Sequence, residues 1–336
     1  MTVTVRRAWG ADAGGMLLHD QSAVAPSPIA LLRSRDVSNA DREVSAGRLV
    51  RVRRGVLAPA AGWDELAPWD RYLARVHAVA LTQPGVVFSH ESAAALWRMP
   101  VLGDPRVVHV TADPTRSARL VGGVRLHTSS DHDEVVDVAG ILIATPGSTA
   151  VSLARSRHPA LGLASADAAL RVDPALGRDH LIDDNEHRAT ARGRRYARWA
   201  LQRADGQAAS VLESFSRAVI EWLGFPEPDL QRPFPTGHGS SEYADFWWEW
   251  LRLVGEADGD LKYDGRFGDG LQQLQRRRDR DLRLLAADAD NVVHWGWPEL
   301  RLIDPVRAAL TGAGLRAVHP EDSAALASFR ALLFSR

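Results

Sequence analysis

Cysteine is absent from the 336-residue sequence, which excludes disulfides, thiolate-ligated zinc, iron–sulfur clusters and a cysteine nucleophile. Lysine is nearly absent, because Lys262 is the single lysine among the 41 basic residues. A charge excess is lacking too: 42 acidic residues give a net charge of −1, which excludes a uniformly basic coat but not local basic patches. No apolar run reaches the roughly 18 residues of a membrane helix, and the N-terminus shows no signal peptide. We therefore expect a soluble cytoplasmic protein without a membrane partner.

The length and composition indicate a globular protein of several domains. The chain is 45% hydrophobic and 25% charged, and 336 residues exceed one ordinary domain. Helical periodicity over 63–100, alternating strands over 106–146 and further helical patterns beyond them predict an α+β protein. We expect three parts: residues 1–62, a mixed α/β middle region at 63–206, and an α/β domain at 207–320. Residues 1–25 predict a loose terminus or one weak helix.

The segment 26–60 is the most basic part of the first half. Its pattern predicts a helix, a turn, a second helix between Ser38 and Gly47, and a hairpin with Gly55 in the turn. This is the winged-helix order. Seven arginines against three acids give the segment a charge of +4. We expect phosphate contacts from five of them: Arg42, Arg48, Arg51, Arg53 and Arg54. The alternative is a small cap with a solvated basic face.

Histidines in the first half give no clear metal signal. His90 and Glu91 fall at a predicted helix start, where a glutamate is favourable without any catalytic role. His109, His127 and His132 lack close metal-ligand spacing, so we expect ordinary strand and loop histidines.

Residues 208–300 carry the strongest chemical pattern. Glu213 lies at the edge of the apolar stripe of an amphipathic helix. A hairpin that turns near Trp250 would set Asp245 about opposite Glu256, with Asp258 on the same face. Clustered carboxylates repel one another, and a hard divalent cation, Mg²⁺ or Mn²⁺, would offset that repulsion.

Lys262 follows Glu256 by six residues. An ammonium there could stabilise a developing phosphate charge or orient a water molecule. Carboxylates that hold a metal, together with one lysine, are suited to metal-assisted phosphodiester hydrolysis. The alternative is a scaffold whose carboxylates are capping or salt-bridged residues.

The motif order over 208–300 resembles the very-short-patch-repair-like branch of the PD-(D/E)XK nucleases, which have a restriction-endonuclease-like fold. The motifs are ESFSR, PEPDLQ, ADFWW, GEADGDLKY, RRRDRDLRLL and VVHWGWPEL. The resemblance implies a metal at Asp245 and Glu256, and a site completed by Glu213, Asp258 and Lys262, with Gln231 as the polar residue that enters the sheet. Two departures bear on activity. Asp258 stands where the family has lysine, and Gln275-Arg276 and Asp279-Arg280 stand where it has Glu-Lys and an acidic pair.

The N-terminal part is similar to AbiEi-type antitoxins of type IV toxin–antitoxin systems, and actinobacterial proteins join such a part to a nuclease-like one. GRLVRVRRGVLAP matches the end of that family's winged helix. The resemblance implies DNA binding, autorepression and a cognate toxin as partner. Two functions follow: a Mg²⁺-dependent DNA endonuclease, or a non-catalytic regulator or antitoxin with a degenerate nuclease fold. RNA is a third substrate option, because phosphodiester contacts serve both nucleic acids.

Overall fold

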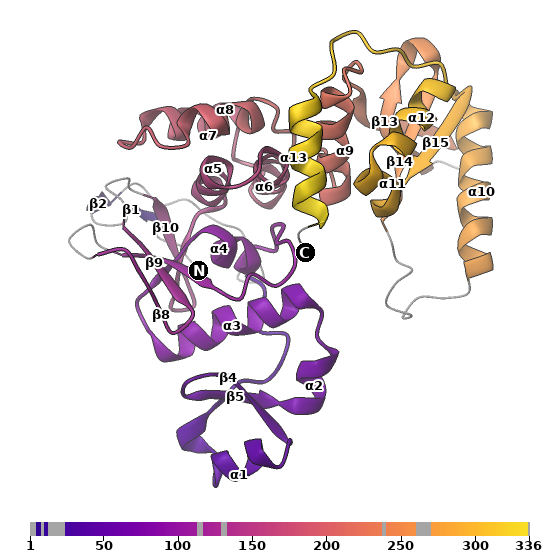
Figure 1. Ribbon diagram of the computed structural model, residues 1–336. Coiled ribbons are helices and arrows are strands. Elements are labelled where there is room, and N and C mark those ends of the chain that lie inside the picture. Colours follow the sequence, from indigo (N-terminus) through magenta and orange to yellow (C-terminus); the bar gives the residue numbers. More distant parts are fainter. Residues whose placement is uncertain are drawn as a thin grey trace. The chain divides into compact units, whose positions relative to one another are not determined.

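The computed structural model describes residues 5–7, 10–12, 24–112, 117–128, 133–236, 240–259 and 270–334. The chain folds into two compact units, Met1–Asp205 and Gly206–Arg336, and each unit has its own sheet and helices (Figure 1). The fold class is α+β, as the sequence predicts. No helix within the described ranges is long and apolar enough to cross a membrane.

The first unit is built on a mixed sheet of eight strands in the order β2-β1-β10-β11-β6-β7-β9-β8. Its strands are β1 (Val5–Arg7), β2 (Gly10–Asp12), β6 (Val87–Phe88), β7 (Val108–Ala112), β8 (Arg119–Val121), β9 (Val124–Thr128), β10 (Glu134–Val138) and β11 (Ile141–Ala144). The predicted strands within 106–146 are confirmed. Residues 5–7 and 10–12 differ from the expected loose segment or weak helix, because β1 pairs antiparallel with β10 and with β2. These two short strands therefore belong to this sheet.

The unit also contains α3 (Pro68–Thr82), α4 (His90–Leu96), α5 (Pro146–Ser156), α6 (Pro159–Val172), α7 (Arg178–His187) and α8 (Arg194–Gln202). Helices α3 and α4 contact strands of the sheet, and α5 to α8 pack on one another. Prolines open α3, α5 and α6, where a missing N–H costs nothing. The side chain of Thr145 caps α5. Helices α5 and α6 are rich in small apolar residues and lie almost wholly buried, which lets them pack closely.

A three-stranded sheet, ordered β3-β5-β4, occupies the predicted winged-helix segment. It comprises β3 (Leu32–Arg33), β4 (Leu49–Arg53) and β5 (Val56–Pro59), with η2 (Ser34–Asp36), α1 (Ala40–Ser45) and α2 (Ala60–Glu65). The basic hairpin is confirmed, and Gly55 supplies the positive φ of +86° at its turn. The predicted first helix is wrong, because residues 32–33 form β3 and only the three-residue 3₁₀ helix η2 lies before the turn. Within 24–59 one six-residue α-helix precedes the hairpin, and it starts after Asn39, whose left-handed backbone ends the preceding turn.

The second unit has a four-stranded sheet in the order β12-β13-β14-β15. The elements are α9 (Val211–Trp222), β12 (Asp229–Thr236), β13 (Ser240–Trp248), η3 (Glu249–Leu251), β14 (Leu253–Ala257), α10 (Gly270–Ala287), β15 (Asn291–Trp295), α11 (Trp297–Leu302), α12 (Asp304–Gly312) and α13 (Ser323–Phe334). The hairpins are antiparallel, whereas β14 and β15 run parallel, with α10 in the connection between them.

The two faces of this sheet bury different helices. On one face Phe246 stacks on Trp295, and α9 adds Phe215, whose ring contacts Phe329 of α13. On the other face Trp247 and Val254 pack with Leu284 of α10, which lies alone on that side in Figure 1. The alternation along β13 and β14 separates these sets. Polar side chains that share the face of Trp247 and Val254 therefore point toward α10.

Candidate active site

The β13–β14 pairing places Asp245 beside Glu256. Phe246 is opposite Gly255 and Trp247 is opposite Val254, so one further step of the register sets Asp245 opposite Glu256. This is the arrangement expected from the turn position. Glu256 is 5% exposed and Asp245 is partly buried. Two carboxylates therefore adjoin on the α10 side of the sheet.

Gln231 links this pair to Glu213. Its Nε2 donates to Glu213 Oε2 at 3.1 Å and to Asp245 Oδ1 at 3.2 Å. Gln231 has a φ of +50°, a left-handed conformation that is unfavourable for a residue with a Cβ. Such strain persists where surrounding contacts fix the residue, and here its amide bridges two carboxylates. The predicted supporting residue thus lies between two of the predicted acids.

Glu213 also has a local structural role. It follows the N-cap Ser210 by three residues, accepts a bond from Ala209 N at 2.8 Å, and donates its own N–H to Ser210 Oγ at 3.1 Å. The Ser210 hydroxyl thus satisfies one free N–H in the first turn of α9, and the Glu213 carboxylate accepts from the residue before the cap. Glu213 is 6% exposed, and its Oε2 accepts from both Ala209 N and Gln231 Nε2.

The electrostatics of the pair are unfavourable without a cation. Burial, followed by the charge of Glu213, raises the pKa of Asp245 to about 6. Burial, followed by the charge of Asp245, raises the pKa of Glu256 to about 8. Asp245 is nevertheless well oriented, since Oδ2 accepts from Ala257 N at 2.8 Å. A positive charge placed between these groups would lower both pKa values.

One cation already contacts the cluster. Arg280 of α10 places Nη2 3.0 Å from Glu256 Oε2, and the same nitrogen donates to Tyr243 O at 2.6 Å. The sequence singled out Arg280 only as a departure from the family pattern, with no role in the site. Lys262, the predicted basic residue of the site, lies outside the described residues.

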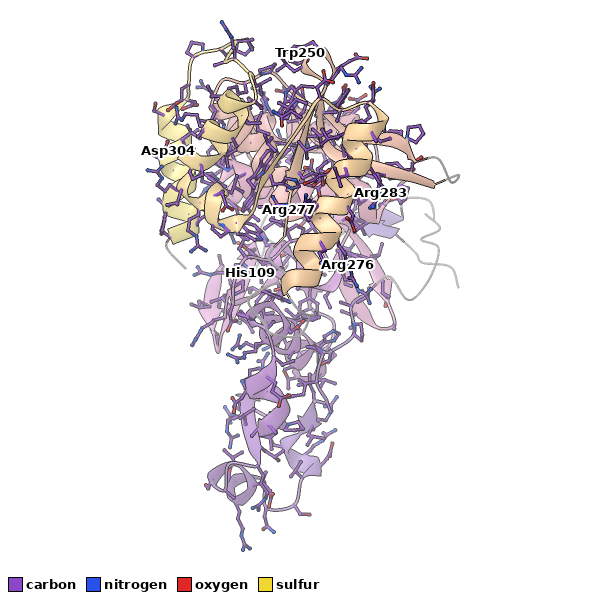
Figure 2. The ribbon with its side chains drawn as sticks, turned by 90° about the vertical axis from the view of Figure 1, so that its right-hand side faces the viewer. His109, Trp250, Arg276, Arg277, Arg283 and Asp304 are labelled. Atoms are coloured by element: carbon purple, nitrogen blue, oxygen red, sulfur yellow. The ribbon has the colours of Figure 1, made fainter. Side chains whose placement is uncertain are left out.

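Asp258 has partners of its own among the described residues. It follows the end of β14, and its Oδ2 is 3.0 Å from His294 Nδ1 and 3.2 Å from Arg277 Nη1 (Arg277 is labelled on α10 in Figure 2). Burial raises its pKa, but His294 and Arg277 outweigh burial, and the net direction is downward. Asp258 is near enough to Glu256 for its charge to help raise the pKa of that carboxyl, and His294, the parallel partner of Glu256 on β15, contacts Asp258.

His294 and Asp281 are site residues that sequence reasoning missed. His294 Nε2 lies 3.0 Å from Asp281 Oδ1, so the imidazole joins Asp281 of α10 to Asp258. Both residues fall within motifs quoted for the family resemblance, yet spacing gave neither a role. The signal that could have indicated His294 is its position directly after two valines of a strand-like segment.

The predicted phosphate-binding arginines have unequal environments. Arg48 forms a two-point pair with Glu43 at 2.6 and 2.7 Å, and Arg51 pairs with Asp41 at 2.8 Å. Arg53 is partly buried; its Nε and Nη1 have no hydrogen-bond partner among the described residues, and burial lowers its pKa. The remaining two, Arg42 and Arg54, are exposed. Internal acids therefore neutralise part of the predicted basic surface.

The fold and site define an α+β protein whose second unit carries a buried carboxylate cluster on a mixed sheet. The chain is 33% identical over 219 residues to "Uncharacterized protein Rv2248" of Mycobacterium tuberculosis (strain ATCC 25618 / H37Rv), covering 64% of this chain and 76% of that protein. The same values hold for "Uncharacterized protein MT2308" of Mycobacterium tuberculosis (strain CDC 1551 / Oshkosh). The chain belongs to the family of these mycobacterial proteins. No family model matches it, and no solved structure is significantly similar.

Proposed function

We propose that the second unit binds a divalent metal ion and hydrolyses phosphodiester bonds of DNA. The observation that carries this proposal is the pair Asp245–Glu256, two adjoining carboxylates with raised pKa values. Burial and the charge of Glu213 raise the pKa of Asp245 to about 6, and burial and the charge of Asp245 raise the pKa of Glu256 to about 8. A purely structural pair would gain more from neutral residues, because each buried ionised carboxylate costs free energy.

The residues present fit Mg²⁺ or Mn²⁺. Asp245 and Glu256 offer hard oxygen ligands, and hydrogen bonds to Gln231, Ala257 N and Arg280 orient them while leaving lone pairs. When bound, such an ion supplies Lewis-acid stabilisation and a more acidic bound water. Arg280 is placed to balance negative charge as a phosphate approaches.

Nucleic-acid binding would use exposed arginines of both units. On α10 Arg276 and Arg278 are exposed, and in the N-terminal hairpin Arg54 is exposed. Arginine suits phosphate because its planar fork donates two parallel hydrogen bonds. We choose DNA rather than RNA as the substrate because the family resemblances of both parts of the sequence imply DNA. An RNA substrate assayed in parallel tests this choice.

The second candidate function is a non-catalytic DNA-binding regulator, an antitoxin that acts with a cognate toxin. One observation favours it: Arg280 already ion-pairs with Glu256 at 3.0 Å. The replacement of the family's lysine by Asp258, which pairs with His294 instead, points the same way. A guanidinium in this place can substitute for the metal and leave a scaffold that only binds.

Cleavage of supercoiled plasmid in Mg²⁺ or Mn²⁺ separates the two functions. We expect metal-dependent nicking by the full chain and loss of nicking in Glu256→Gln and Lys262→Ala. Glu227→Gln is the matched control, because its carboxylate is 81% exposed and lies outside the cluster. Salt-sensitive binding to its own promoter without nicking in either metal would overturn the hydrolase and support the regulator.

A further inference from the structure

Three histidines of the first unit converge in space although they are distant in sequence. His90 begins α4, His109 lies on β7 and His127 lies on β9. One ring nitrogen from each falls within 4.8 Å of the others. His109 Nδ1 and His127 Nε2 are 2.8 Å apart, and the rings of His90 and His127 stack at 4.2 Å between centroids. His109 and His127 lie on strands, as expected, but nothing in the sequence spacing indicated that they meet each other and His90; His132 lies outside the described residues.

The sheet explains the pairing of His109 with His127. In the parallel β7–β9 pair, His109 is opposite Arg125 and Thr111 is opposite His127. The two histidines are thus diagonal neighbours on one face, because side chains two residues apart share a face. No spacing in the sequence marks this relation.

His90 reaches the same place through an unusual backbone. It has a φ of +50°, a left-handed conformation at the first residue of a helix. Outliers of this type concentrate at ligand-binding and catalytic sites, since other contacts must hold them. Here Ser89 N donates to His109 O at 3.1 Å, and His109 N donates to Ser92 Oγ at 2.7 Å. These bonds fix the start of α4 against β7.

The surroundings suit a metal ion with nitrogen ligands. His90, His109 and His127 are all partly buried, and a neutral imidazole offers one ring nitrogen with a free lone pair to a metal. Glu91 Oε2 lies 3.6 Å from His109 Nε2, the nitrogen that points away from His127. Arg157 holds Glu91 with two hydrogen bonds. A carboxylate behind a ligating histidine is a common feature of metal sites, since it orients the ring.

We propose that His90, His109 and His127 form a zinc site. Three neutral imidazoles without a thiolate match the ligand sets of zinc centres in which a water molecule or a substrate takes the fourth position. Imidazole nitrogens favour Zn²⁺, whereas the oxygen ligands of the second unit favour Mg²⁺ or Mn²⁺. The site is thus chemically distinct from the carboxylate cluster and does not depend on its activity.

The test measures metal binding by the full chain, purified with a chelator and dialysed. Zn²⁺ is titrated by calorimetry, and Co²⁺ is followed by its visible absorption, which is strong for a tetrahedral site. All proteins carry Asp245→Asn, so that the carboxylate cluster contributes little. We expect one Zn²⁺ per chain, and at least a tenfold loss of affinity in both His109→Gln and His127→Gln.

His187→Gln is the control, since His187 is an exposed histidine of the same unit outside the cluster. Circular dichroism of the metal-free variants shows whether each one folds. Zinc binding that is absent, or that is unchanged in folded His109→Gln and His127→Gln, would overturn the proposal. Tight binding lost in both but retained in His187→Gln would support it. Plasmid nicking plays no part in this readout, so the failure of one proposal leaves the other intact.

Discussion

The charge of Glu256 makes a specific prediction about stability in the absence of metal. The pKa of Glu256 is about 8 in the folded chain, against 4.5 for an ordinary glutamate. The folded state holds this proton more tightly than the unfolded state does. The contribution of Glu256 to the free energy of unfolding is therefore most favourable below pH 4.5, and it is lost as the pH rises toward 8. Glu256→Gln cannot ionise and should lack this loss.

The magnitude follows from linkage. Each pH unit between the two pKa values costs about 1.4 kcal/mol, so the loss from pH 5 to pH 8 has a ceiling of about 4 kcal/mol. Asp245 shares part of the same repulsion, and local relaxation reduces the ceiling further. We expect the stability of Glu256→Gln relative to the native chain to improve by about 2–3 kcal/mol between pH 5 and pH 8.

Urea unfolding in a chelator, followed by tryptophan fluorescence, measures this difference, since Trp247, Trp248 and Trp295 are buried in the same unit. Glu227→Gln should track the native chain at both pH values. Mg²⁺ at pH 8 should stabilise the native chain more than Glu256→Gln. A relative stability that does not change with pH, or that favours the native chain at pH 8, would refute the electrostatic reasoning.

Three further predictions concern charge and backbone. Arg280→Gln removes the cation beside Glu256 and should raise its pKa further, which carbon NMR of labelled glutamate measures; an unchanged pKa would show that the ion pair contributes nothing. Gly224→Ala should destabilise the chain by about 2–4 kcal/mol in urea unfolding, because φ is +80° and the new Cβ would lie 2.1 Å from His319 O. Gly312→Ala, which meets nothing within 4 Å of the described residues, should cost little, and equal losses would contradict the steric argument. Arg54→Ala should weaken DNA binding and reduce the slope of log affinity against log salt by about 1. An unchanged slope would remove Arg54 from the interface.

Local patterns predicted much of the second unit. The two-residue alternation of β13 and β14 and the turn near Trp250 set the register that pairs Asp245 with Glu256. The apolar stripe and the Ser210 cap predicted α9 with Glu213 at its start. These features follow from backbone geometry, which acts over a few residues and is visible in a single sequence.

The same reasoning failed where local signals were weak. The first helix of the expected winged helix is a two-residue strand followed by a 3₁₀ turn, because the short apolar segment before Ser38 pairs with β5 instead of folding on itself. An edge strand and a short helix have similar composition. A sheet partner some 25 residues later in the chain decided between them.

The sequence by itself determined that the protein is α+β, where its basic hairpin turns, and which two carboxylates of the second unit adjoin, because strand alternation and turn position are local properties. Only the tertiary structure decided that Arg280 contacts Glu256, that His294 joins Asp258 to Asp281, and that His90, His109 and His127 meet. These residues come from elements whose relative placement depends on helix packing and on parallel strand pairing. Such contacts leave no periodic trace along the chain, because any of several packings would satisfy the same local pattern.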